Sequence, residues 1–171
     1  MRVSQRLIDA LNEQVGNEMF ASMKYLSIAS YFDGETLPTL ARFFFRQSEE
    51  EREHAMKFLR FLLDTGASVE IPAVPVPPHH FDSAENAVET ALKGEKEVTS
   101  QIENLVRIAD EDNNFTARNF LNWFLEEQLE EEDSVSSLLD TVRRAGSDRL
   151  LDVEAYLDRE GLMLSESGPE E

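Results

Sequence analysis

Residues 46–55 read Arg-Gln-Ser-Glu-Glu-Glu-Arg-Glu-His-Ala, and within them Glu51 and His54 stand three residues apart. Apolar residues around them recur with helical spacing, so the two side chains share one face of a helix. A carboxylate and an imidazole that converge from one helical turn can hold a divalent metal. The same pair also occurs as two solvated side chains on a charged helix. Its meaning therefore depends on the rest of the chain.

The composition favours a globular protein that interacts with cations. The 171 residues are expected to form one domain, 1–171, and 41% of them are hydrophobic. A formal charge of -19 argues against nucleic acid as a partner and favours cations, although acidity can also serve solubility alone. Without cysteine, any metal must be held by oxygen and imidazole. No apolar run approaches the roughly 18 residues of a membrane span, and the N-terminus lacks a signal peptide's apolar core, so a cytoplasmic location is expected.

Apolar periodicity predicts an all-α fold with four long helices, a shorter fifth helix and a loose polar tail. The segment between the second and third helices, residues 67–82, contains four prolines and cannot be helical. Fully extended it spans about 50 Å, the length of a thirty-residue helix. It is therefore interpreted as a crossover between parallel helices of a four-helix up-down bundle, with a linker between two domains as the second interpretation. The expected ranges are about 4–33, 36–65, 83–111 and 115–145 for the bundle (4–145 in all), 147–160 for the fifth helix and 161–171 for the tail.

The inward line of each long helix is apolar at both ends and polar in the middle. Because these polar residues fall near the helix midpoints, they lie at one level of the bundle. Several unpaired carboxylates in an apolar interior cost several kcal/mol each unless they are protonated, hydrated or neutralised by cations. Metal binding is the simplest explanation, and a polar layer that only fixes helix register is the other. The residues at this level are Glu18, Glu51, His54, Glu95, Gln128 and Glu131.

Glutamates from several helices, together with Glu-x-x-His, are typical of di-iron carboxylate bundles. A carboxylate that bridges two such metals holds them about 3.5 to 4 Å apart. Tyr25 lies two turns beyond Glu18 on the same inward line. It is expected either to hydrogen-bond a ligand or donate an electron, or to be a packed core tyrosine.

With Asn12-Glu13-Gln14, Glu18, residues 50–55 and residues 123–131 in view, the chain resembles a bacterial non-haem ferritin from about Ser4 to Gly161. The resemblance implies a ferroxidase that oxidises Fe(II) with dioxygen or peroxide, two irons per subunit, and a twenty-four-subunit cage that stores ferric mineral. By this resemblance Glu18, Glu51 and His54 bind the first iron, Glu51 and Glu95 bind the second, and Gln128 lies near the second. A possible third iron site is implied at Glu50, Glu127, Glu130 and Glu131, although acids of this run are equally typical of a solvated helix face.

The same comparison argues against haem. Haem-containing bacterioferritins carry a second Glu-x-x-His where this chain has Gln128 to Glu131, and a haem-ligating methionine where it has Arg52. The acidic turn 110–112 resembles a channel lining, and acids at a helix end are also common without that role. Two other interpretations remain: a di-iron oxidase or peroxidase on the same bundle, and a non-catalytic helical scaffold.

Overall fold

The computed structural model describes residues 3–160, and this part of the chain is helical without any strand. The helices are α1 (Gln5–Gly34), α2 (Pro38–Asp64), α3 (Ala84–Glu111), α4 (Phe115–Ala145) and α5 (Leu150–Glu160). The all-α prediction is confirmed, and the long helices begin and end close to the expected residues. The predicted fifth helix differs at its start, because Ser147–Arg149 form a 3-10 turn before α5. The tail predicted for 161–171 lies outside the described residues.

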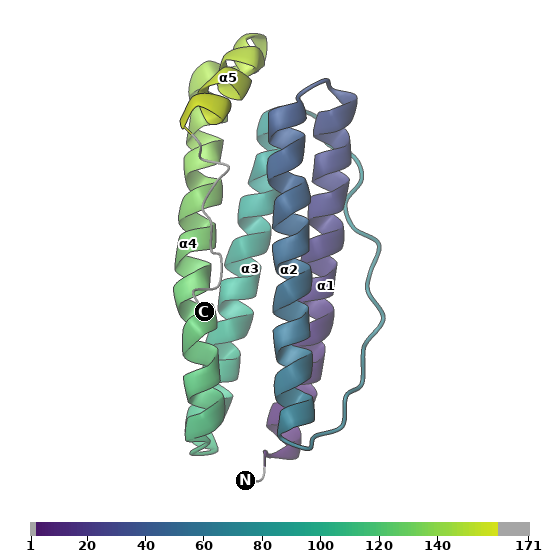
Figure 1. The fold of residues 1–171 in the computed structure, drawn as a ribbon, viewed down its shortest axis with the longest axis vertical. Helices are drawn as coiled ribbons and strands as arrows, with labels where there is room; N and C mark the ends of the chain where they lie inside the picture. The colour runs from purple at the N-terminus through teal and green to yellow at the C-terminus, as the bar shows by residue number, and fades with distance from the viewer. Residues whose placement is uncertain (1–2, 161–171) are drawn as a thin grey trace.

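The chain runs up α1, down α2, down α3 and up α4, so α2 and α3 are parallel (Figure 1). The extended segment between them travels back along the bundle beside α1, and α5 is tilted across the end of the bundle that α4 reaches. The predicted long crossover is therefore confirmed. It connects α2 to α3.

Specific contacts hold the crossover against α1. Gly66, with φ of 73°, lies two residues beyond the end of α2, and the next N–H, that of Ala67, donates to the Leu62 carbonyl at 3.0 Å. The Asn12 side chain then pairs with the extended backbone: its amide nitrogen donates to the Ser68 carbonyl at 3.0 Å, and its oxygen accepts from the backbone N–H of Glu70 at 2.7 Å. One buried amide thus anchors the start of the crossover.

Gly16 lets the crossover approach α1 closely. A Cβ on this residue would lie 2.3 Å from Cγ of Pro72, whose ring cannot move aside freely. We expect Gly16→Ala to destabilise the bundle by about 1 to 3 kcal/mol, because the proline must be displaced. Urea unfolding of the metal-free protein measures this loss. Gly34→Ala is the matched control, since a Cβ there meets nothing within 4 Å; equal stabilities of the two variants would contradict the prediction.

A carboxylate of α5 caps the start of α2. Leu37, the N-cap residue, provides no side-chain hydrogen bond. Instead Glu154 accepts from the backbone N–H groups of Thr39 and Leu40, both at 2.8 Å. A carboxylate at a helix N-terminus satisfies free N–H groups and interacts favourably with the helix dipole. Glu154 therefore fixes the short helix to the bundle.

Replacing Glu154 by alanine is expected to cost about 1 to 2 kcal/mol of stability, because two buried N–H groups lose their acceptor. Equilibrium unfolding gives the free energy, and hydrogen exchange of α5 amides shows whether this helix detaches first. Asp158→Ala on the same helix is the control: its carboxylate is exposed and lies 3.7 Å from Arg42, a pair of little energetic value. A similar loss in both variants would argue against the capping role.

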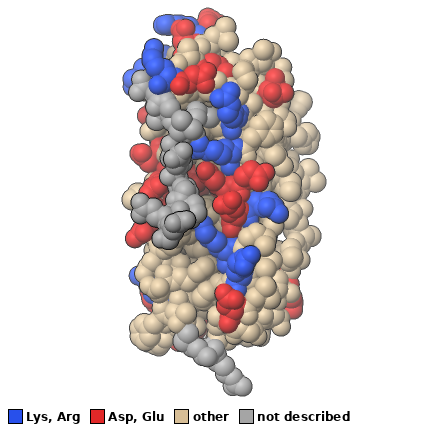
Figure 2. All heavy atoms as spheres, in the orientation of Figure 1, with Lys and Arg blue, Asp and Glu red and all other residues tan. Residues whose placement is uncertain are grey.

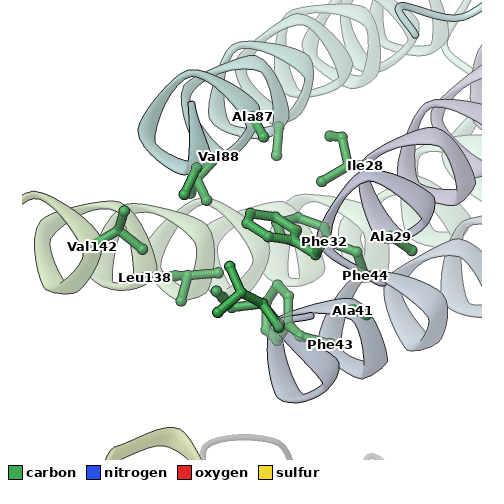
Figure 3. Close-up of a cluster of buried hydrophobic side chains, with 14 of the residues drawn as sticks. Ile28, Ala29, Phe32, Ala41, Phe43, Phe44, Ala87, Val88, Leu138 and Val142 are labelled. Carbon is green, nitrogen blue, oxygen red and sulfur yellow. The ribbon is translucent and has the colours of Figure 1, made fainter. Parts of the chain in front are cut away.

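The hydrophobic core is divided into two clusters, one toward each end of the bundle. Phe32 and Phe44 stack at 5.5 Å in the cluster near α5, and side chains from all four long helices surround them (Figure 3). At the other end Phe58 stacks on Phe124 at 4.1 Å. Along each long helix the buried carboxylates fall between the two clusters, so the polar layer lies at mid-bundle as predicted.

Candidate metal centre

The predicted polar layer forms in the interior. Its residues come from all four long helices, and none is more than 7% exposed. Each interrupts an apolar stripe, which places it at the bundle axis once the stripes pack together. The residues brought to this level are Glu18, Glu51, His54, Glu95, Gln128 and Glu131.

Glu18, Glu51 and His54 form the tightest group. One ligand atom of each lies within 4.8 Å of the other two, and Nδ1 of His54 is 3.3 Å from Oε2 of Glu51. In the described part of the chain, Oε2 of Glu18 and Oε1 of Glu51 are buried without a hydrogen-bond partner. Buried carboxylate oxygens without partners are costly, and a cation is the partner that best satisfies them. This set of oxygen and imidazole donors suits iron or manganese.

Glu95 is held from two sides. The Tyr25 hydroxyl donates to its Oε1, and the amide nitrogen of Gln128 donates to its Oε2 at 3.1 Å. Tyr25 also packs against Phe44, with ring centroids 5.7 Å apart. Tyr25 is therefore a core residue whose hydroxyl hydrogen-bonds a carboxylate of the layer.

A second group combines His54 with Glu127 and Glu131 of α4, again with ligand atoms within 4.8 Å. The amide nitrogen of Gln47 connects this group to Glu50, because it donates to Glu131 at 2.7 Å and to Glu50 at 3.0 Å. Gln47 lies on the inward line of α2 and could have been identified from that position. Glu130 belongs to neither group: it is exposed, about 100° around the helix from Glu131.

Burial dominates the proton affinities of the layer. It raises the pKa of Glu51 and of Glu95 to about 7, raises that of Glu131 to about 10, and raises that of Glu18 well above its ordinary value. Neighbouring carboxylates add to the increase for Glu18 and Glu131. Burial lowers the pKa of His54, which favours the neutral imidazole that a metal requires. The layer therefore binds protons strongly and has the groups to bind metal in their place.

Aromatic rings orient the imidazole. His54 makes edge contacts with Trp123 and Phe124, at centroid distances of 5.4 and 5.8 Å. The ammonium group of Lys57, an exposed residue, lies 3.6 Å from the Trp123 ring centroid. Trp123 thus packs against the candidate ligand His54.

The acidic turn 110–112 lies away from this layer, and its acids interact with other side chains of the chain. Arg118 pairs with Asp110 at 3.0 Å, Arg6 pairs with Glu111 at 2.5 Å, and Ser4 donates to Asp112. Elsewhere on the surface, acidic side chains gather about halfway along the face shown in Figure 2, with Lys and Arg above and below them. Within residues 3–160, no helix combines the length and hydropathy needed to cross a membrane.

The chain is similar to several known proteins. A family model described as a ferritin-like domain matches residues 8–145. Ferritin BfrB of Mycobacterium tuberculosis is 40% identical over 150 residues, which cover 88% of this chain and 82% of that protein. A bacterial non-heme ferritin of Staphylococcus aureus is 38% identical over 146 residues, 85% of this chain and 88% of that one. Among solved structures, an open pore ferritin of the archaeon Archaeoglobus fulgidus superposes with a TM-score of 0.89 at 37% identity, covering 96% of this chain and all of the other.

Proposed function

Since this chain belongs to the ferritin family, we propose that it stores iron, and that it oxidises Fe(II) to Fe(III) at the mid-bundle layer before depositing it as mineral. The observation that carries this proposal is the group of Glu18, Glu51 and His54, buried together with carboxylate oxygens that have no other partner. A bound cation would satisfy these carboxylate oxygens and remove the free-energy cost of their burial.

Iron is the substrate in this mechanism. In this proposal Glu18 and His54 hold one Fe(II), Glu95 holds a second, and Glu51 contacts both. Two irons side by side give one electron each, so two electrons and two protons convert one dioxygen to peroxide, or one peroxide to water. The protein's contribution is to fix the positions of the ions and to neutralise their charge. Gln128 and Tyr25 keep the Glu95 carboxylate in place through their hydrogen bonds.

In this proposal the oxidised iron moves next to the second group, His54, Glu127 and Glu131. Glu127 and Glu131 share His54 with the first group, and Gln47 connects Glu131 to Glu50. We assign these carboxylates to a third iron site on the way out of the layer. Glu130, exposed beside them, would meet the iron only after it has left the interior.

The protein is further inferred to assemble into a homo-oligomeric cage, of twenty-four subunits, in the cytoplasm. The similarity to proteins named ferritin, over nearly the full length of both chains, supports this assembly.

Iron loading followed by size-exclusion chromatography tests the proposal. The protein is loaded anaerobically with Fe(II), exposed to air and separated by size, and iron is measured in each fraction. A large shell that carries far more than two irons per chain is the expected result. A dimer with about two irons per chain would instead indicate a di-iron oxidase or peroxidase, and a protein without stoichiometric iron would indicate a helical scaffold.

A further inference from the structure

Lys24 is a buried cation next to the polar layer. It lies on α1, directly before Tyr25, and only 7% of it is exposed. Its ammonium group lies 5.0 Å from the ring centroid of Phe20, and within residues 3–160 it forms no salt bridge or hydrogen bond. A charge in such a position is costly unless other charges nearby compensate for it. Glu51 and Glu95 of the acidic layer are carboxylates with which this charge interacts.

Gly94 makes room for this cation. A Cβ on residue 94 would lie 2.6 Å from Nζ of Lys24, so the ammonium group rests against the backbone of α3. The next residue of α3 is Glu95. Burial raises the pKa of Glu51 and Glu95, and the positive charge of Lys24 opposes this increase in both. The cation therefore acts on carboxylates from two different helices.

We propose that Lys24 is a fixed positive charge that weakens cation binding at the mid-bundle layer, and weakens it more for Fe(III) than for Fe(II). This inference rests on the proposed function. Coulomb repulsion is proportional to the charge of the bound ion, so a trivalent product is repelled 1.5 times as strongly, in free energy, as a divalent substrate. Lys24 thus acts through the carboxylates rather than by touching the reacting iron. Its effect is to help oxidised iron leave the layer.

Redox-inert ions separate this effect from activity. Zn²⁺ and Tb³⁺ stand for the divalent and trivalent states, and calorimetry on the metal-free protein gives both affinities. We expect Lys24→Met, which keeps the length and apolar stem of the side chain, to bind Zn²⁺ on the order of tenfold more tightly and Tb³⁺ on the order of thirtyfold more tightly. Lys24→Gln should behave in the same way and serves if the methionine variant does not fold.

Lys93→Met is the matched control. It removes the same charge from the residue next to Gly94, but this lysine side chain is 79% exposed and is screened by solvent. Its affinities should equal those of the unmodified protein. The inference would be overturned if the ratio of the Zn²⁺ affinity to the Tb³⁺ affinity were unchanged in both Lys24 variants, or if it changed equally in Lys93→Met. The double variant Glu51→Ala, His54→Ala shows whether the ions bind at the layer at all: if it binds them as tightly as the unmodified protein, the proposed function fails as well.

Discussion

Replacing Glu51 and His54 together by alanine is expected to abolish rapid Fe(II) oxidation while the bundle stays folded. The two residues belong to the tightest ligand group, and Glu51 is the carboxylate proposed to contact both irons. Their loss leaves Glu18 and Glu95 on separate helices without the connecting ligand. We expect the initial oxidation rate to fall by roughly a hundredfold or more, since even outer partners of metal ligands account for about 10 to 100-fold. Stopped-flow absorbance after mixing Fe(II) with oxygenated buffer measures this rate.

The fold is expected to tolerate the double change, because it removes a buried carboxylate that is costly without a metal. Circular dichroism and the size-exclusion profile should match those of the unmodified protein. A variant with both Glu49 and Glu53 changed to alanine alters exposed acids of the same helix and should oxidise iron at the normal rate. Near-normal oxidation in the Glu51 and His54 double variant would refute the proposed centre.

The sequence predicts the height of the polar layer along the bundle and the helix faces that it occupies, because both follow from the helical repeat. Glu51 and His54 share a face through their spacing alone, and each of the other long helices interrupts an apolar line at the same height. The contact of Glu154 with the start of α2 has no such basis, since the N–H groups that donate to its carboxylate lie more than one hundred residues away in the chain. Lys24 lies off the inward line of α1, and its burial depends on a glycine of another helix. The apolar periodicity of a single helix therefore does not predict contacts that depend on how two helices are aligned with each other.

The metal-free protein is expected to lose stability as the pH rises from 5 to 8. Burial raises the pKa of Glu51 and Glu95 from an ordinary 4.5 to about 7, so the folded state holds protons that the unfolded chain has already released. Where the folded state binds more protons, the free energy of unfolding falls with increasing pH. A difference of about 2.5 pKa units corresponds to at most about 3 kcal/mol for each of the two groups. Urea unfolding at fixed protein concentration, in a chelating buffer from pH 5 to pH 8, gives the slope.

Glu131 extends the same effect to higher pH, because burial and its carboxylate neighbours raise its pKa to about 10. Glu131→Gln removes this group while keeping an oxygen for the amide of Gln47. The variant should therefore be more stable than the unmodified protein at pH 8, and its free energy of unfolding should fall less steeply with pH. An unchanged slope would contradict the assigned burial of this carboxylate.

Adding Zn²⁺ to the unmodified protein should reverse the sign of this slope, so that the free energy of unfolding rises with pH. The reason is that metal binds the ionised carboxylates, and its binding is favoured as protons leave. A reversal shows that metal and protons compete for the same buried oxygens, which a layer that only sets helix register would not produce.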